Sequence, residues 1–160
     1  MPQKSETLER VQFRDARRDD LETIVRLLAA DSLGSWREAI GNGALPEAYM
    51  RAFDTIDRDA NNRIIVGDLD GKIVACLQLT FIPGLTYAGG MRAQIEGVRV
   101  DQELRGSGVG RALIEYAIKL SREKACVLVQ LTTDKRRPEA LAFYQALGFS
   151  ASHEGMKLRF

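Results

Sequence analysis

A glycine-rich stretch between a β-branched segment and an amphipathic segment is the part of the sequence best suited to bind an anion. Residues 95–100 read as a strand, and residues 105–111 are Arg-Gly-Ser-Gly-Val-Gly-Arg. An apolar face follows at helical spacing, made of Val109, Ala112, Leu113, Tyr116, Ala117 and Leu120. The first-turn N–H groups of a helix lack intrahelical acceptors, and glycines let a ligand approach the backbone closely. With Arg105 and Arg111 beside it, the loop is predicted to hold a phosphate or pyrophosphate.

Two common phosphate-binding motifs do not fit this loop. A P-loop requires Gly-Lys-Ser/Thr, and a dinucleotide fingerprint requires an acidic residue closing a following strand at the right distance; the sequence has neither. The pattern Arg105-x-x-Gly108-x-Gly110 after a Val-rich strand resembles instead the acetyl-CoA loop of the Gcn5-related N-acetyltransferase (GNAT) family. For the loop alone, a plain strand-to-helix turn is the alternative interpretation.

A second motif near the end of the chain resembles the same family. Residues 138–149 match its last conserved helix, written A-x-x-F-Y-x-x-x-G-F, and follow the loop in the family's order. The resemblance covers about residues 10–160 and is strongest over 96–149. It implies a mixed α/β (α+β) fold in a single domain, residues 1–160. It also implies a twisted, mostly antiparallel sheet of about six to seven strands with a splayed parallel pair, flanked by about four helices. Acetyl-CoA is the co-substrate implied.

Transfer of an acetyl group from a thioester to an amine requires a base, because an ammonium group is not a nucleophile. The resemblance implies that Glu96, on the central strand, is this base, acting directly or through water. The alternative for Glu96 is an outward-facing strand carboxylate paired with Arg99 or Arg63. A charge among Ile95, Val98 and Val100 favours the catalytic interpretation.

Tyr144 matches the family's usual acid for the departing thiolate. The alternative is a packed ring, since Ala140, Phe143, Tyr144 and Leu147 form a helical apolar stripe. A packed tyrosine still requires a partner for its hydroxyl group, which favours function here.

The resemblance also implies which residues bind the cofactor. The backbone of the splayed central strand pairs with the peptide-like pantetheine arm, and the loop N–H groups hold the pyrophosphate. The predicted set is Val98, Val100, Arg105, Gly106, Ser107, Gly108, Val109, Gly110, Arg111 and Arg137. Arg137 stands where the family often has Asn, so it either contacts a CoA phosphate or is a solvated charge.

The composition fits a globular chain without a strongly charged partner. Apolar residues make up 45% and charged residues 28%, and 23 basic against 22 acidic side chains give a net charge of +1. This balance favours neither nucleic acid nor a membrane as a partner. Cys76 and Cys126 lie in apolar runs typical of buried thiols in a reducing compartment, so a cytoplasmic location is expected. With one histidine and no Cys/His cluster, no metal site is predicted.

Periodicity and turn residues predict the remaining elements. Strands are expected over 11–16, 62–67, 72–81, 91–100 and 125–132, with a terminal hairpin over 149–160 and a frayed start over 1–8. Helices are expected to begin at Asp19 or Asp20, near Pro46, after the glycine loop and at Pro138. Asp70-Gly71 between two β-rich runs predicts a tight hairpin.

The acceptor is the least constrained part of the prediction. In the family, acceptor specificity resides in the segments that correspond here to residues 32–58, 83–93 and 150–156, which mix aromatic and acidic side chains. Three functions fit: an N-acetyltransferase for a small-molecule amine, the same chemistry on a protein N-terminus or lysine, or a non-catalytic CoA-binding sensor. Many family members are dimers, so a homodimer is compatible with the resemblance.

Overall fold

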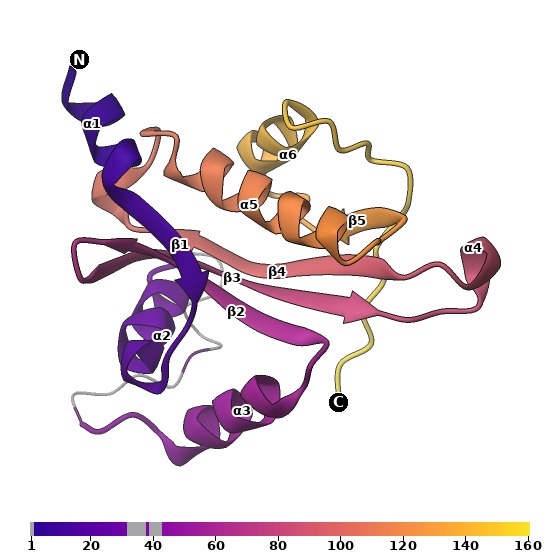
Figure 1. Cartoon of the computed structure of the whole chain (residues 1–160), viewed down its shortest axis with the longest axis horizontal. Coiled ribbons are helices and arrows are strands. Elements are labelled where there is room, and N and C mark those ends of the chain that lie inside the picture. Colours follow the sequence, from indigo (N-terminus) through magenta and orange to yellow (C-terminus); the bar gives the residue numbers. More distant parts are fainter. Residues whose placement is uncertain (1, 32–37, 39–42) are drawn as a thin grey trace. The chain divides into compact units, whose positions relative to one another are not determined.

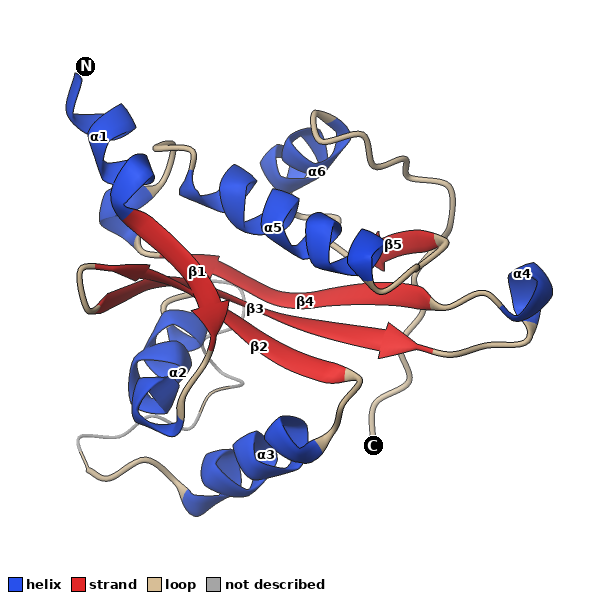
Figure 2. Ribbon diagram, in the orientation of Figure 1, coloured by secondary structure: helices blue, strands red, loops and turns tan. Residues whose placement is uncertain are grey.

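A five-stranded sheet in the order β1-β2-β3-β4-β5 forms the centre of the fold (Figures 1 and 2). The computed structural model describes residues 2–31, 38 and 43–160. The strands are β1 (Val11–Asp15), β2 (Asn62–Leu69), β3 (Lys72–Ile82), β4 (Arg92–Val100) and β5 (Leu128–Leu131). The first three neighbouring pairs are antiparallel, whereas β5 runs in the direction of β4 (Figure 2). The predicted mixed α/β class, mostly antiparallel with one parallel pair, is confirmed.

The four predicted helices are all present. They are α2 (Leu21–Ala29), α3 (Glu47–Arg58), α5 (Val109–Glu123) and α6 (Pro138–Gln145). A further helix, α1 (Pro2–Arg10), and the short turn α4 (Thr86–Gly89) were not predicted. In α4 Tyr87 and Ala88 have positive φ of 55°, so it is a left-handed turn rather than a regular α-helix. The frayed start expected for residues 1–8 is wrong for residues 2–8, because they belong to α1, where Pro2 takes the first position and loses no hydrogen bond.

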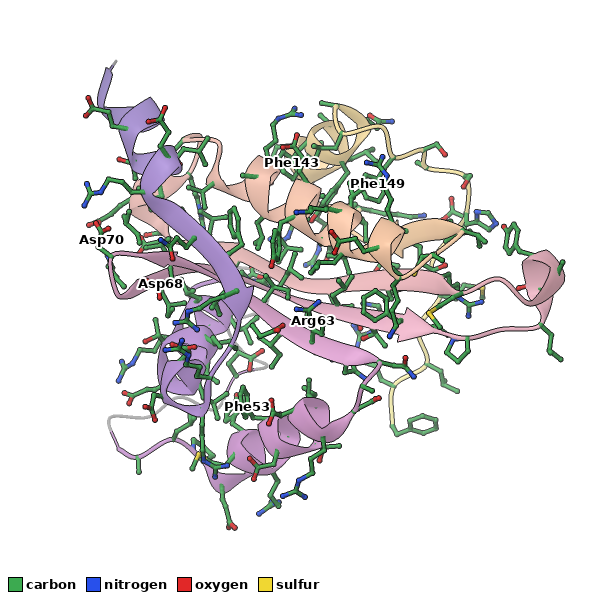
Figure 3. The ribbon with its side chains drawn as sticks, in the orientation of Figure 1. Phe53, Arg63, Asp68, Asp70, Phe143 and Phe149 are labelled. Carbon is green, nitrogen blue, oxygen red and sulfur yellow. The ribbon has the colours of Figure 1, made fainter. Side chains whose placement is uncertain are left out.

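The predicted hairpin between β2 and β3 is confirmed. Asp70 and Gly71 both have positive φ, 50° and 89°, as a two-residue type I′ turn requires. The Asp68 carboxylate accepts a hydrogen bond of 2.7 Å from Gly71 N and so reinforces the turn. Figure 3 labels Asp68 and Asp70 at this end of the hairpin.

Helices cover the two faces of the sheet differently (Figure 2). On one face α5 packs against β3 and β4, and its buried Leu113, Ile114 and Ala117 belong to the core with the β4 residue Ile95. On the other face Ile24 of α2 packs with Val66, Ile73 and Cys76. Phe53 of α3 completes a neighbouring cluster with Leu21 and Val25 (Figure 3).

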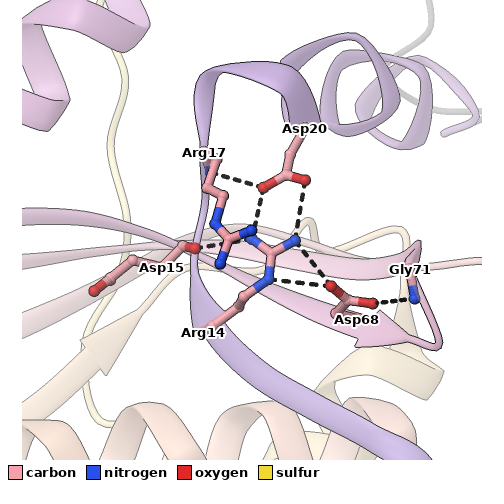
Figure 4. Close-up of polar contacts among 6 residues, drawn as sticks. All are labelled: Arg14, Asp15, Arg17, Asp20, Asp68 and Gly71. Carbon is pink, nitrogen blue, oxygen red and sulfur yellow. Dashed lines mark hydrogen bonds and ion pairs between the residues drawn. The ribbon is translucent and has the colours of Figure 1, made fainter.

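Arg14 of β1 joins three elements through two carboxylates (Figure 4). Its guanidinium donates to Asp20, in the 3-10 turn Arg18–Asp20, at 2.7 and 3.1 Å and to Asp68 of β2 at 2.9 and 3.1 Å. Burial alone would raise the pKa of Asp20, but hydrogen bonds from the Arg14 side chain and from Arg17 N outweigh it and lower that pKa. The cluster therefore fastens the start of α2 to the sheet.

The chain divides into two compact units, Met1–Gln130 and Leu131–Phe160. The second contains α6, which begins at Pro138 and is followed by Gly148 with φ of 92°. The terminal hairpin predicted over 149–160 is wrong, because these residues form no strand. The segment contains no Val, Ile or Thr, the residues that favour strands most. Without this hairpin the described residues form five strands, instead of the six to seven that were predicted.

Candidate active site

Glu96 lies on β4 opposite Gln78 of β3, with an exposed side chain. The alternative that pairs it with Arg63 or Arg99 is wrong. Arg63 binds Asp15 through two hydrogen bonds of 2.7 and 2.8 Å, and Arg99 binds Asp31 at 2.8 Å. Glu96 has no ion pair with any residue in the described part of the chain. Its carboxylate is accordingly accessible to a ligand.

A bulge in β4 immediately follows Glu96. The β3–β4 register shifts between Cys76 and Gln78, and Gly97 has a φ of 61°, which only glycine adopts without strain. Leu28 of α2 lies 3.5 Å from where a Cβ on Gly97 would stand. A glycine inside a strand is a sequence signal that can predict such a bulge.

The second half of β4 has a backbone edge that β5 does not reach. Val127 N donates to Met91 O at 2.7 Å, so β5 starts beside the beginning of β4. Parallel strands advance together by about 3.3 Å per residue, and the four residues of β5 therefore end before Val98. Asp101 N donates to Val74 O of β3 at 2.8 Å, so by alternation the backbone groups of Val98 and Val100 point to the opposite, uncovered edge.

The glycine-rich loop connects this strand to α5 through a short 3-10 turn, Gln102–Leu104. Gly106 and Gly108 have φ of 74° and 95°, and the first helical bond runs from Ala112 N to Gly108 O at 3.0 Å. The N–H groups of Val109, Gly110 and Arg111 precede that bond and therefore have no acceptor within the helix. The loop thus presents a row of N–H groups at the positive end of the α5 dipole.

The polar side chains of the loop divide into engaged and accessible ones. Ser107 donates both its hydroxyl (2.5 Å) and its N–H (3.2 Å) to Leu104 O, so its side chain serves the turn. Arg111 is exposed, and its Nη1 lies 3.6 Å from Glu115 Oε1, one turn along α5. Arg105 is exposed, and no ion pair joins it to another described residue. Leu8 of α1 also lies at the loop, 3.2 Å from where a Cβ on Gly108 would stand, and no sequence signal pointed to it.

Tyr144 and Arg137 belong to the second unit. The half-buried Tyr144 ring contacts the rings of Phe143 and Phe149 edge-on, with centroid distances of 5.1 and 5.9 Å. Figure 3 labels these two phenylalanines. Arg137 precedes α6, and its carbonyl accepts from Ala140 N and Leu141 N at 3.1 and 3.2 Å. Hydrogen bonds from the Arg136 side chain and backbone hold the pKa of Asp134 below its ordinary range.

Several other features bear on the sequence predictions. Burial raises the pKa of the Cys76 thiol to about 12, which confirms a buried, unreactive thiol. A pocket of about 510 Å³ lies between α3, the C-terminal end of α5 and the beginning of β2, and none of the predicted site residues lines it.

In the described part of the chain, no helix is long and apolar enough to span a bilayer. Of the predicted acceptor segments, residues 32–37 and 39–42 lie outside the described residues.

Comparison with known proteins agrees with this geometry. The profile of the acetyltransferase (GNAT) family matches residues 30–149, so the chain belongs to this family. A crystal structure of a transcriptional regulator from Bacillus halodurans C-125 is 51% identical, with a TM-score of 0.91, and the match covers 94% of this chain and 99% of that one. A putative acetyltransferase from Agrobacterium tumefaciens str. C58 is 28% identical, with a TM-score of 0.80, covering 93% and 99%.

A curated relative has a named activity. The glucosamine 6-phosphate N-acetyltransferase of Trypanosoma brucei brucei is 39% identical over 88 residues, which is 55% of this chain. The match spans 58% of the length of that relative.

Proposed function

We propose that this chain is an acetyl-CoA-dependent N-acetyltransferase that transfers an acetyl group to a primary amine of a small molecule, by direct attack in a ternary complex. The observation that carries the proposal is the bulged β4, which leaves Glu96 without an ion pair among the described residues and leads through an uncovered edge into the glycine loop. Membership of the GNAT family supports the same chemistry.

The residues present fit a CoA thioester. The edge at Val98 and Val100 that β5 does not reach is complementary to the amides of a pantetheine arm, which would add to β4 as a further strand does. Val98 O already accepts a hydrogen bond from Arg99 Nη1 at 2.7 Å, so the groups offered first are Val98 N–H and the backbone of Val100. The first-turn N–H groups of α5, together with Arg105, suit a pyrophosphate. Ser107 is proposed to contribute to cofactor binding by shaping the loop, because its hydroxyl and its N–H both donate to Leu104 O. Arg137 is proposed to contact a phosphate from the second unit.

In this proposal the bound co-substrate supplies the activated acetyl group. Glu96 accepts the proton of the acceptor ammonium, directly or through one water, and so generates the nucleophile. Tyr144 donates its phenolic proton to the departing thiolate. An ordinary thiol has a pKa of about 8.5, so its thiolate is a fair leaving group and Glu96 carries more of the rate than Tyr144.

The choice of a small-molecule acceptor rests on the name of the Trypanosoma relative, which acts on glucosamine 6-phosphate. The proposal also includes a cytoplasmic location and no nucleic-acid or membrane partner, and it allows a homodimer. A non-catalytic CoA-binding sensor is the second candidate, because the 51% identical Bacillus structure is described as a transcriptional regulator. Turnover of a peptide rather than a small amine would identify a protein acetyltransferase instead.

Thermal unfolding with and without acetyl-CoA tests the cofactor site. Ligand at a hundred times its dissociation constant adds about 2.7 kcal/mol, which raises Tm by about 5–10 °C in a chain of this size. Gly108→Glu should abolish this shift, because it adds a side chain and a negative charge at the loop. Gly71→Ala is the matched control, since Gly71 also has positive φ but lies at the β2–β3 turn. Amine-dependent release of CoA thiol then separates an enzyme from a sensor. A folded wild type without a shift would refute the proposal.

A further inference from the structure

A row of polar side chains lies on the face of β3 and β4 opposite α5. The register pairs Arg92 with Ile82, Gln94 with Thr80 and Glu96 with Gln78, and paired residues of antiparallel strands point to the same face. The intervening β4 residues Ala93 and Ile95 are buried in the core on the α5 side. Arg92, Gln94 and Glu96 therefore share the other face, and none of them is fully buried.

The uncharged members of this row bind one another. Asn62 Oδ1 accepts hydrogen bonds from Gln78 Nε2 at 3.1 Å and from Thr80 Oγ1 at 2.7 Å. Gln130 Nε2 of β5 donates to Gln94 Oε1 at 2.7 Å. These contacts hold the amides in place, between β2 and β3 and between β4 and β5. Among the described residues, Arg92 and Glu96 are the charged members of the row, and neither makes a side-chain hydrogen bond or an ion pair.

Arg92 differs from the other arginines on the described strands. Arg14, Arg63 and Arg99 each bind at least one aspartate. Arg92 is half-buried, and within the described ranges its guanidinium makes no hydrogen bond or ion pair. Its Nε is buried without an acceptor, as is that of Arg99, but the other two guanidinium nitrogens of Arg99 bind Asp31 and Val98 O. Nη1 lies 3.6 Å from where a Cβ on Gly84 would stand, under the β3–β4 connection. A buried donor without a partner is costly, and a ligand is a standard reason for keeping one.

The spacing of the two charged residues suits a small bifunctional molecule. Four residues of a strand separate the Cα atoms of Arg92 and Glu96 by about 13 Å. Both side chains are long and lie on one face. Their guanidinium and carboxylate can therefore approach each other more closely than the Cα atoms do, and one small molecule could contact both. A guanidinium fork matches a carboxylate or a phosphate, whereas Glu96 suits an ammonium group.

We propose that Arg92 binds an anionic group, a carboxylate or a phosphate, of the acceptor whose amine is delivered to Glu96. The inference rests on the proposed function and narrows its substrate class to amines that carry a second, negatively charged group. Gln94 and Gln130 lie between the two ends, where hydroxyl groups of such an acceptor would meet amides.

Matched pairs of acceptors test this proposal. D-Glucosamine 6-phosphate is compared with D-glucosamine, and 6-aminohexanoate with its amide, so that one arm carries a phosphate and the other a carboxylate. In the wild type, kcat/KM should favour the anionic member of at least one pair by about tenfold to a hundredfold. In Arg92→Gln the preference should fall to about one, through loss of kcat/KM for the anionic member. Arg122→Gln, which removes an exposed arginine of α5, should keep the preference.

A second measurement separates this proposal from the proposed function. Calorimetric titration of the CoA-saturated protein with the preferred anion should show about a tenfold weaker Kd in Arg92→Gln, even if no amine is turned over. The Tm of Arg92→Gln should equal or exceed that of the wild type, because the substitution removes a donor without a partner. An unchanged anion preference, or a wild type that neither prefers nor binds the anionic members, would overturn the role of Arg92. Absence of any acetyl-CoA shift would instead refute the proposed function.

Discussion

Arg99 of β4 binds Asp31, which lies just beyond the C-terminal end of α2, across 68 residues of sequence. Its Nη2 donates to Asp31 Oδ2 at 2.8 Å, and its Nη1 donates to Val98 O at 2.7 Å. The Asp31 side chain is 4% exposed and that of Arg99 20% exposed, so the pair is largely removed from water. One guanidinium thus connects α2 to the strand segment directly after the bulge, where the pantetheine arm is proposed to bind.

Removal of Asp31 should therefore affect both stability and cofactor binding. Asp31→Ala leaves the Arg99 charge largely buried without this partner, so we expect the free energy of unfolding to fall by about 2–4 kcal/mol. The KM for acetyl-CoA should rise, because the backbone at Val98 loses its support. Urea denaturation and steady-state kinetics measure the two effects. Glu22→Ala breaks an exposed ion pair with Arg26 and should cost less than about 1 kcal/mol. Equal losses in the two variants would contradict this role for the buried pair.

Substitution of the proposed base should lower turnover without weakening cofactor binding. Glu96→Gln keeps the size of the side chain but cannot accept a proton at neutral pH, so we expect kcat to fall by about a hundredfold to ten-thousandfold. The Kd for acetyl-CoA should stay within about twofold. Glu123→Gln on α5 is the control, since its carboxylate is exposed and far along the chain from the loop. If kcat of Glu96→Gln stays within about threefold of the wild-type value, another residue must be the base.

The hydroxyl of Tyr144 can be tested separately from its ring. Tyr144→Phe keeps the aromatic contacts with Phe143 and Phe149 and removes only the proposed acid. We expect kcat to fall by only about tenfold to a hundredfold, because a thiolate leaving group needs only modest assistance. The alkaline limb of the pH profile of kcat should also change, because the proposed acid is removed. Tyr116→Phe is the matched control, since the Tyr116 ring packs on Phe13 at 5.6 Å. A loss of stability with unchanged kcat would indicate that Tyr144 is a packing residue.

Local rules explain which parts of the fold were predictable. Asp70-Gly71 specifies its turn through backbone conformation alone, and the glycines of the loop specify the entry to α5 in the same way. The apolar face of α5 likewise follows from spacing within fifteen residues. The terminal hairpin over 149–160 was mispredicted, and this segment, which forms no strand, contains no Val, Ile or Thr to favour one.

The partners of charged residues could not be predicted, because they depend on which distant elements meet. Arg99 and Asp31 stand 68 positions apart, and Arg63 and Asp15 stand 48 positions apart. From the sequence, Arg63 and Arg99 were possible partners for Glu96. Only the folded structure shows that each of them binds an aspartate instead. For the same reason no sequence signal distinguished Arg92 from the other arginines. Only in three dimensions is it visible that Arg14, Arg63 and Arg99 bind aspartates, whereas Arg92 has no ion pair with a described residue.

The Arg14 cluster gives a pH-dependent prediction for stability. The pKa of Asp20 is lowered in the folded state, so its contribution is complete above the ordinary carboxyl pKa of about 3.9 and is lost as the pH falls through the lowered value. Asp20→Asn should therefore be less stable than the wild type by about 2–4 kcal/mol at pH 7 and pH 5. Below about pH 4 the difference should shrink, because the Asp20 carboxyl of the unfolded chain then binds a proton; it should vanish below the lowered folded-state pKa, where the native carboxylate is protonated as well while Arg14 stays charged. Urea denaturation at pH 7, 5, 4 and 3 measures it, with the exposed neighbour Asp19→Asn as control. A constant difference down to pH 3 would mean that Asp20 stabilises the fold by packing and neutral hydrogen bonds rather than by its charge.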